Sequence, residues 1–546
     1  MAKPRPTLPI SLLSIMTATV LTGAAGAAPA AADSVTARAA VTVPAAARTA
    51  GTPVATTAFR FVTVPGAGVN LKANVIAPAA AGRYPAIILP SSWGLNDLEY
   101  LAQAKALAGR GYVVVSYTPR GWWSSEGEID TAGPLDMSDL SKVIDWTIAN
   151  TAADPARIGA AGISYGAGIS LLGSAFDPRI RAVVMMSGWT DLVYSLYGDL
   201  TRHRQSAGLL EFAAGTLGNP GPDLTGKLDD FAADRNVEEI IAWAGVRSPA
   251  TYLDAINANR PAVLIANAWG DSFFPPNQLV DFYDRLRTPK RLELRPGDHA
   301  IAEAAGVLGL ENEVWTSLYR WFDQHLAGID TGIGREPSVQ VKPHNAATEG
   351  YRDWAEFSPA ARRYGLGRIR RLDDTGLLGG APAAGWSKTL PADRDTRATG
   401  GPVLITNGIA AFTGERPKIW LPAVNRDRAG VWASERPSTA QRIRGIPKLH
   451  LELTGTAPRG TVVAYLYDLD RFGNARLITH APAGWQGTAG GDRSIDLALS
   501  ATAYDLPAGH SLTLVVDTVD PLYHEENAPD GSITITGGSY LDVPLR

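Results

Sequence analysis

Residues 157–172 read RIGAAGISYGAGISLL, and this stretch decides the fold of the chain. Its first part is a short apolar run, typical of a buried strand, and its last part has apolar residues at helical spacing. Between them, Gly162-Ile163-Ser164-Tyr165-Gly166 fits the pattern G-x-S-x-G. A strand, a tight turn with small neighbours and a helix form the setting in which a serine is exposed as a nucleophile. We predict this role for Ser164; a plain Gly-Ser turn is the alternative.

Strand and helix patterns alternate on both sides of this stretch. Apolar runs that predict strands buried on both faces lie at residues 86–89, 112–117, 158–162, 182–186, 262–266 and 291–294. Helical patterns lie between several of them, at residues 98–108, 137–149, 166–175, 276–286 and 314–326. The runs at 59–64 and 71–76 alternate like half-buried strands. The alternation predicts an α/β fold with a mostly parallel, doubly wound sheet and helices on both faces.

Two other regions depart from this alternation. Residues 189–260 have helical patterns without strands, and we interpret them as a cap inserted over the carboxyl edge of the sheet. From about residue 336, Gly and Pro separate short alternating runs at residues 339–341, 448–453, 461–467, 494–499, 511–517 and 533–536. Such runs predict an antiparallel sandwich of the jelly-roll type. The expected domains are an α/β domain at 59–330 and a β-sandwich domain at 336–546.

The composition excludes several classes of protein. The length of 546 residues allows about two to four domains. With 45% hydrophobic and 19% charged residues, the chain has enough apolar material for large cores and is not globally disordered. A net charge of −4 gives no reason to expect nucleic acid or an anionic membrane as a partner. The absence of cysteine excludes disulfides, Cys-ligated zinc, iron–sulfur clusters and a cysteine nucleophile. No phosphate-binding loop or zinc motif is present, and we expect no cofactor and no metal.

The N-terminal residues have the pattern of an export signal. Lys3 and Arg5 form a basic start, residues 8–21 are mostly apolar, and a run of alanines supplies a cleavage site. A membrane anchor is the alternative, but the apolar run is short for a span. We expect a cleaved signal peptide at 1–32, an alanine-rich leader at 33–58, and a secreted mature chain without membrane attachment.

A nucleophilic serine needs a base, and the base needs a carboxylate that orients it. Where the nucleophile sits on such a turn, the acid and then the histidine follow it along the chain. Asp271 comes after the predicted strand at 262–266, and His299 comes after the next strand. Both loops are expected at the edge of the sheet that carries Ser164. We predict the triad Ser164, His299 and Asp271, with the neighbouring Asp298 as the alternative acid.

An oxyanion hole needs two donors aimed at the developing negative charge. The backbone N–H of Tyr165 is one of them, because this residue follows the nucleophile in the turn. The loop after the strand at 86–89 reads Pro90-Ser91-Ser92-Trp93-Gly94. We predict the second donor at Trp93, through its indole or its backbone N–H; a Trp that only packs is the alternative.

At these residues the chain resembles the X-prolyl dipeptidyl-peptidase/cocaine esterase family of serine hydrolases. The serine turn with Tyr165 is the form found in that family, and residues 120–128 (RGWWSSEGE) are similar to a loop typical of it. Residues 321–328 (WFDQHLAG) look like the family's last hydrolase helix, and residues 351–354 (YRDW) like a segment early in its C-terminal domain. The resemblance covers roughly residues 60–546.

The resemblance implies an α/β-hydrolase core with a helical cap, a jelly-roll domain that helps to wall the site, and the triad given above. It also implies a side-chain oxyanion donor at Trp93, where relatives such as the cocaine esterases have a Tyr hydroxyl. Aromatic residues are expected near the mouth of an acyl pocket: Trp122, Trp123, Trp189, Phe273 and Phe274. Packing in the core is the alternative for each of them.

Three functions stay open on the sequence. The main one is an exported serine hydrolase that cleaves peptides with a penultimate proline through an acyl-enzyme, and a carboxylesterase or acylase of the cocaine-esterase type is the alternative. A dipeptidyl-peptidase needs carboxylates for the free amine of its substrate, for which the cap offers Asp191, Asp199 and Glu211. A solvated cap face is the alternative for these acids. The third function is a non-catalytic surface-binding protein; for either enzyme the partner is a small peptide or ester substrate.

Overall fold

The computed structural model describes residues 56–413 and 415–546, and these residues belong to one compact unit. The predicted signal peptide and nearly all of the predicted leader lie outside the described residues. In the described part of the chain, no helix is long and apolar enough to cross a membrane.

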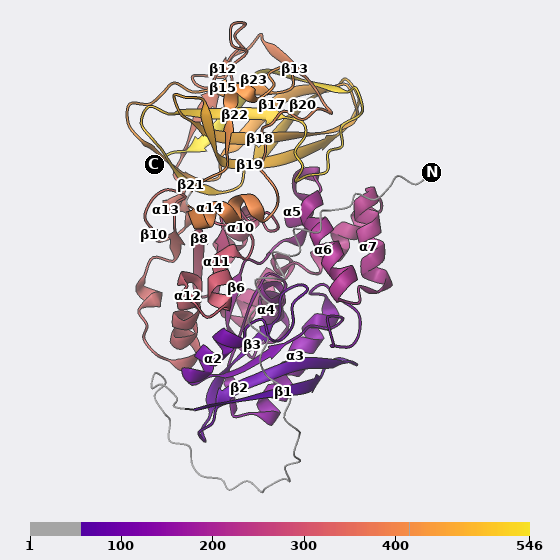
Figure 1. The fold of residues 1–546 in the computed structure, drawn as a ribbon, viewed down its shortest axis with the longest axis vertical. Coiled ribbons are helices and arrows are strands. Elements are labelled where there is room, and N and C mark those ends of the chain that lie inside the picture. Colours follow the sequence, from indigo (N-terminus) through magenta and orange to yellow (C-terminus); the bar gives the residue numbers. More distant parts are fainter. Residues whose placement is uncertain (1–55, 414) are drawn as a thin grey trace. The chain divides into compact units, whose positions relative to one another are not determined.

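A mixed sheet forms the centre of the first part of the chain (Figure 1). Its strand order is β1-β2-β4-β3-β5-β6-β7-β8-β9-β10, and neighbours from β4 to β9 in this order run parallel. Every residue of β4 and β7 is buried, as expected where helices cover both faces of a sheet. The predicted doubly wound sheet is confirmed. Its strands are β1 (Thr57–Pro65), β2 (Asn70–Pro78), β3 (Tyr84–Pro90), β4 (Val113–Tyr117), β5 (Ala153–Ile163), β6 (Ile180–Met186), β7 (Ala262–Ala268), β8 (Lys290–Arg295), β9 (Val339–Val341) and β10 (Glu349–Tyr351).

Helices pack on both faces of this sheet. On one face, α2 (Leu101–Gly109) and α12 (Glu313–Phe322) form an apolar core with the side chains of alternate strand residues. A second and larger core lies on the other face. The helices that contribute to it are α3 (Pro134–Asn150), α4 (Tyr165–Phe176), α9 (Leu253–Asn259) and α10 (Asn277–Arg285).

The central sheet extends further along the chain than the sequence predicts. The run at 339–341 was expected in the sandwich, but it is β9 and pairs in parallel with β8, with Val339 opposite Leu292. The assignment of this run to the sandwich is therefore wrong. Three alternating residues suit an edge strand of either sheet, so the pattern alone does not distinguish the two. β10 completes the sheet by antiparallel pairing with β9.

The segment between β6 and β7 is helical, as predicted for the cap. It contains α5 (Leu192–Tyr197), α6 (Arg204–Leu217), α7 (Gly221–Ala233) and α8 (Val237–Gly245) before the chain returns through α9. α9 packs on α4, and the side-chain amide of Asn259 donates to the carbonyls of Ser174 and Ala175 at 2.9 Å each. These bonds satisfy carbonyls at the end of α4 and fix the point at which the chain leaves the cap.

The second part of the chain is a sandwich of antiparallel sheets, as predicted (Figure 1). In β17, alternate residues Leu449, Leu451 and Leu453 are buried in the core between the sheets. One sheet contains β11 (Ala361–Gly365), β23 (Ser532–Pro544), β17 (Lys448–Gly455), β20 (Asp492–Ala498) and β13 (Ser387–Pro391). The other contains β12 (Gly376–Leu377), β15 (Gly430–Ala433), β22 (Ser511–Asp517), β18 (Arg459–Leu469), β19 (Asn474–Gln486) and β14 (Lys418–Trp420). β16 (Gln441–Gly445) and β21 (Thr502–Leu506) form a separate pair.

The sandwich is bound to the α/β part of the chain by specific polar contacts. The side chain of Asn277, at the start of α10, donates to the carbonyl of Leu499 at 3.0 Å and accepts from the N–H of Ala501 at 2.7 Å. The cap is held as well, because Asp234 at the end of α7 forms an ion pair with Arg459 of β18. The sandwich thus supports both the helix that follows the Asp271 loop and the cap.

Candidate active site

Ser164 lies on a strained turn between β5 and α4. Its φ of 55° and ψ of −116° are sparsely populated for a residue with a side chain. The turn is possible because its neighbours are glycines: a Cβ on Gly162 would lie 2.4 Å from the carbonyl carbon of Gly166, and one on Gly166 would lie 2.1 Å from the oxygen of Pro90. The N–H of Ser164 donates to Met186 at 2.9 Å, which anchors the turn to β6.

His299 and Asp271 lie beside this serine. Nε2 of His299 is 2.9 Å from Ser164 Oγ, and its Nδ1 is 3.1 Å from Asp271 Oδ2. The other carboxylate oxygen of Asp271 accepts from the backbone N–H groups of Phe273 and Phe274 at 2.9 and 2.8 Å. With the proton on Nδ1, the imidazole donates to the acid and accepts from the serine. The three predicted residues therefore form one continuous chain of hydrogen bonds.

Asp298, the alternative acid, has a different position. Its Oδ1 accepts from the N–H of His299 at 2.7 Å and from the N–H and hydroxyl of Ser272 at 2.9 and 2.7 Å. Burial, with a smaller effect from the charge of Asp271, raises the pKa of Asp298 to about 6, although these hydrogen bonds lower it. Asp298 thus joins the loop of Asp271 to the loop of His299. The carboxylate that contacts the imidazole is that of Asp271.

The electrostatic surroundings favour protonation of the His299 imidazole. Burial by itself lowers the pKa of this group, but the charge and hydrogen bond of Asp271 outweigh burial and raise the pKa above 6.5. The charges of Asp298 and Glu303 act in the same direction. The imidazole of His299 is therefore a stronger base than an ordinary histidine side chain.

Aromatic rings enclose the histidine. The ring of Phe273 stacks on His299 with centroids 4.6 Å apart, and Phe274 meets it edge-on at 5.1 Å. Trp189 packs on Phe274 and donates its indole N–H to the carbonyl of Arg247 at 2.8 Å. These three aromatic residues are buried and exclude water from one side of the imidazole.

The two predicted oxyanion donors, Tyr165 and Trp93, differ in the hydrogen-bond partners of their N–H groups. Tyr165 is the first residue of α4, so its backbone N–H has no partner within the helix. The backbone N–H of Trp93 has no hydrogen-bond acceptor among the described residues. The indole N–H of Trp93, in contrast, donates to the carbonyl of Leu210 in α6 at 2.9 Å. The indole is therefore occupied by the cap, and the side-chain donor implied by the family resemblance is not available at this position.

The tryptophans of residues 120–128 differ from each other. Trp122 is fully buried and meets Trp93 edge-on with centroids 4.8 Å apart. Trp123 is half exposed, has a φ of 50°, and donates its indole N–H to the carbonyl of Gly94 at 3.0 Å. Residues 90–94 are called the oxyanion loop after their predicted donor. Trp122 belongs to the packing against this loop, whereas Trp123 covers it from the solvent side.

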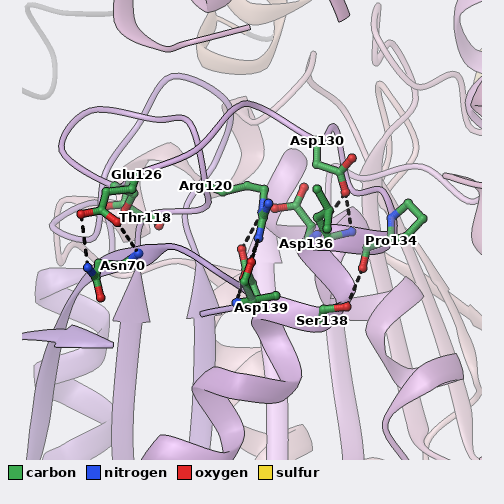
Figure 2. A network of polar contacts seen from close by, with 12 residues as sticks. Asn70, Thr118, Arg120, Glu126, Asp130, Pro134, Asp136, Ser138 and Asp139 are labelled. Atoms are coloured by element: carbon green, nitrogen blue, oxygen red, sulfur yellow. Dashed lines mark hydrogen bonds and ion pairs between the residues drawn. The ribbon is translucent and has the colours of Figure 1, made fainter. Parts of the chain in front are cut away.

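A network of polar contacts joins Arg120 to an acid on α3 (Figure 2). Arg120 binds the carboxylate of Asp139 through Nε at 2.8 Å and Nη2 at 3.0 Å, and both side chains are buried. Asp136, on the same helix α3, accepts from Tyr165 Oη at 2.5 Å. Burial, with the nearby charge of Asp130, raises the pKa of Asp136 to about 8. Asp136 and the backbone N–H of Ala132 thus hold the phenol of Tyr165, which the sequence pattern did not indicate.

The cap acids have separate environments. Asp191 accepts from the N–H of Tyr194 at 3.0 Å and caps α5, so its carboxylate has a structural partner. Asp199 and Glu211 are exposed.

Across residues 56–413 and 415–546, no cluster of three or more His, Asp or Glu side chains is arranged to hold a metal ion.

Two further buried acids close to the site were not singled out from the sequence. Glu303, on α11 (Ile301–Val307), accepts from Ser187 Oγ at 3.0 Å, and burial raises its pKa to about 7. Glu99 precedes α2 and binds Ser92 of the oxyanion loop. Their burial follows from tertiary packing, and nothing in the local sequence distinguishes them from surface acids.

Comparisons with known proteins identify the family of the chain. Residues 67–301 match the family model "X-Pro dipeptidyl-peptidase (S15 family)", and residues 331–541 match "X-Pro dipeptidyl-peptidase C-terminal non-catalytic domain". A protein of Streptomyces avermitilis named "Putative Xaa-Pro dipeptidyl-peptidase" is 23% identical over 478 residues, which cover 76% of this chain and 68% of that protein.

Solved structures share the fold over both parts of the chain. An α-amino acid ester hydrolase superposes with a TM-score of 0.67 at 16% identity, covering 92% of this chain and 98% of that one. A CocE/NonD family hydrolase from Staphylococcus aureus superposes with a TM-score of 0.68 at 14% identity, covering 89% and 94%. The two matched family models together span most of the chain and follow each other in the order of the two parts described above. The chain therefore belongs to the X-Pro dipeptidyl-peptidase (S15) family of serine hydrolases.

Proposed function

We propose that Ser164, His299 and Asp271 are the catalytic triad of a hydrolase that works through an acyl-enzyme. The observation that carries the proposal is the continuous chain from Ser164 Oγ through the imidazole to Asp271, with distances of 2.9 and 3.1 Å. A second support is the strained turn at the start of α4, because a nucleophilic serine between a strand and a helix needs such a turn.

In this mechanism the serine oxygen attacks the substrate carbonyl while His299 Nε2 takes its proton. The tetrahedral intermediate places its negative oxygen at the N-terminus of α4, where the N–H groups of Tyr165 and Trp93 stabilise it. His299 then gives the proton to the leaving group, and the acyl-enzyme remains on Ser164. A water molecule then attacks the acyl-enzyme while His299 takes its proton. His299 returns this proton to Ser164 Oγ, and the acid product leaves.

The substrate that we propose is a peptide with a penultimate proline, cleaved after that proline. Both matched family models carry the name X-Pro dipeptidyl-peptidase, which supports this choice. Such an enzyme holds the free amine of its substrate with a carboxylate. With Asp191 engaged as a helix cap, Asp199 and Glu211 remain the candidates from the cap.

An esterase or acylase is the second candidate. The observation that favours it is the apolar enclosure of His299 by Phe273, Phe274 and Trp189, which suits an acyl group without charge. The α-amino acid ester hydrolase and the CocE/NonD family hydrolase have the same fold over nearly the whole chain, so one scaffold serves both kinds of substrate.

We further propose that the protein is secreted after removal of residues 1–32. This rests on the basic, apolar and small-residue pattern of the N-terminus. N-terminal sequencing of the protein from the culture medium of the producing cells tests it; a mature chain that retains Lys3 and Arg5 contradicts it.

Turnover of the purified chain on two substrates side by side tests the activity. One is a Gly-Pro anilide with a free or an acetylated N-terminus, and the other is a short acyl phenyl ester. Anilide cleavage that disappears on acetylation supports the dipeptidyl-peptidase, and ester cleavage alone supports the esterase. If neither is cleaved and the protein binds glycans or other proteins instead, the non-catalytic function replaces both; Ser164→Ala is the control for background hydrolysis.

A further inference from the structure

The backbone in front of the nucleophile is held by the loop that leads from β3 to α2. The N–H of Ile163, the residue before Ser164, donates to Tyr100 Oη at 2.9 Å, and its carbonyl accepts from Ser92 Oγ at 2.9 Å. Ser92 is bound in turn by Glu99: its N–H donates to Oε2 at 2.7 Å, and its Oγ lies 2.6 Å from Oε1. A chain of short contacts therefore runs from Glu99 through Ser92 to the serine turn.

The Ser92 hydroxyl has one hydrogen for two short contacts. An ionised Glu99 only accepts, so the hydroxyl hydrogen would point to Oε1, and the carbonyl of Ile163 would face Ser92 Oγ at 2.9 Å with no hydrogen between them. A Glu99 protonated on Oε1 donates to Ser92 Oγ, which frees the hydroxyl hydrogen for Ile163. Only the protonated form places one hydrogen in each contact.

The surroundings of Glu99 also favour the neutral form. The side chain is buried, and the groups that act on its pKa are Ser92 and Tyr100, neither of them a cation. Burial raises the pKa of Glu99 to about 7, although the hydrogen bonds from these two residues lower it. Burial and the charge of Glu99 raise the pKa of Tyr100 well above its ordinary value, so this titratable neighbour stays neutral while Glu99 titrates.

We propose that Glu99 is a positioning residue that works as a neutral acid: through Ser92 and Ile163 it fixes the nucleophile turn relative to the oxyanion loop. Ser92 is followed directly by Trp93, and Ile163 is followed directly by Ser164. Ionisation of Glu99 removes the bond to the Ile163 carbonyl and loosens the link between nucleophile and oxyanion donor. This role rests on the catalytic function proposed above.

The test compares Glu99→Gln with Glu99→Ala. The Gln amide donates to Ser92 Oγ and its carbonyl accepts from the Ser92 N–H, so it reproduces the neutral acid at every pH. Ala removes both contacts, and Ser92→Ala removes the link to Ile163 while Glu99 remains. Asp517→Asn is the matched control, because Asp517 in β22 is another buried acid with a raised pKa and contacts Thr396 of the sandwich instead.

The first measurement is the melting temperature as a function of pH, which needs no substrate. The folded chain holds a proton on Glu99 that the unfolded chain releases, so the wild type loses stability relative to Glu99→Gln as pH rises from about 4.5 through about 7. We expect the difference in melting temperature to grow by about 2–5 °C over this range. A difference that does not change with pH overturns the protonated Glu99.

The second measurement is kcat/KM across pH. We expect kcat/KM of Glu99→Gln to exceed that of Glu99→Ala and Ser92→Ala by at least about tenfold, mainly through kcat. The wild type should lose part of its activity as Glu99 ionises, and Glu99→Gln should not. If Gln and Ala have equal kcat while the pH-dependent melting difference persists, Glu99 is neutral but does not position the turn, and the proposal is overturned. A wild type that hydrolyses no substrate, with the melting result as expected, contradicts the proposed function and leaves the protonated Glu99 intact.

Discussion

Trp93 donates its indole N–H to the carbonyl of Leu210 at 2.9 Å, so the oxyanion loop is bound to helix α6 of the cap. Trp93→Phe keeps the backbone N–H and an aromatic ring beside Tyr165, and it removes this hydrogen bond together with part of the ring system. We expect kcat to fall by less than about tenfold, whereas loss of a side-chain oxyanion donor costs about 100- to 1,000-fold. Steady-state kinetics on any substrate that the wild type turns over decides between the two.

Trp123→Phe is the matched control for this substitution. It removes the hydrogen bond from the indole N–H of Trp123 to the carbonyl of Gly94, which follows Trp93 in the chain. This bond has a similar length, and its donor is a half-exposed side chain. Both variants should then have similar kcat values. A loss at Trp93 alone of about 100-fold or more would mean that the indole leaves Leu210 and serves the oxyanion.

Ser164→Ala should lower kcat/KM by several orders of magnitude, about 10⁶-fold where chemistry limits the rate, because it removes the proposed nucleophile. The melting temperature should change little. Ser174→Ala, in the same helix, removes only a hydrogen bond to Leu171 and is expected to keep normal turnover. Equal turnover in Ser164→Ala and the wild type would show that another residue is the nucleophile.

Activity should fall as pH drops through the pKa of His299, because the protonated imidazole cannot take the serine proton. Asp271 raises this pKa above 6.5, so the midpoint of the acid limb should lie above 6.5. In Asp271→Asn the charge is lost and the effect of burial remains, which moves the midpoint to lower pH and costs about 10⁴-fold in kcat. The pH profile of kcat/KM measures both effects; an unchanged midpoint would assign the orienting carboxylate elsewhere.

Asp298→Ala should destabilise the protein by about 3 kcal/mol, because it leaves the N–H of His299 and the N–H and hydroxyl of Ser272 without their acceptor. Asp298→Asn keeps an acceptor at the same place. The pKa of Asp298 is raised to about 6, so ionisation costs stability above that pH, and the Asn variant should melt at or above the wild type there. Thermal denaturation on both sides of about pH 6 shows whether the two variants separate in this way.

Arg120→Met should destabilise the protein by about 3–5 kcal/mol, since it leaves the buried carboxylate of Asp139 without its cation. The double variant Arg120→Met/Asp139→Leu should recover much of this loss, because no charge is left buried. Melting temperatures of the two single variants and the double variant form the required cycle. Additive losses would mean that the two side chains do not depend on each other.

The proximity of Ser164, His299 and Asp271 was predictable because each residue follows a strand whose apolar run is visible in the sequence. Carboxyl ends of neighbouring parallel strands meet at one edge, so the strand pattern alone brings the three loops together. The run at 339–341 was not predictable in this way. It is too short for its partner strand to be recognised, and only contacts with β8 decide its place.

The direction of the Trp93 indole and the bonds around Glu99 could not be predicted either. The indole meets a carbonyl 117 residues later in the chain, and Ser92 meets a carbonyl 71 residues later. Such contacts depend on how side chains fill space after the elements have packed, and neighbouring residues carry no sign of them. The sequence therefore indicates the reacting groups better than the groups that hold them.

Asn277 is held by the backbone of Leu499 and Ala501, 222 and 224 residues further along the chain. On the ribosome, the serine, the acid and the histidine all emerge long before these two residues do. A nascent polypeptide that stops short of residue 501 already contains the complete triad, yet the helix after the Asp271 loop lacks its anchor. We therefore expect a chain truncated before residue 499 to contain the three residues but to hold α10, and with it the Asp271 loop, less firmly than the full chain does.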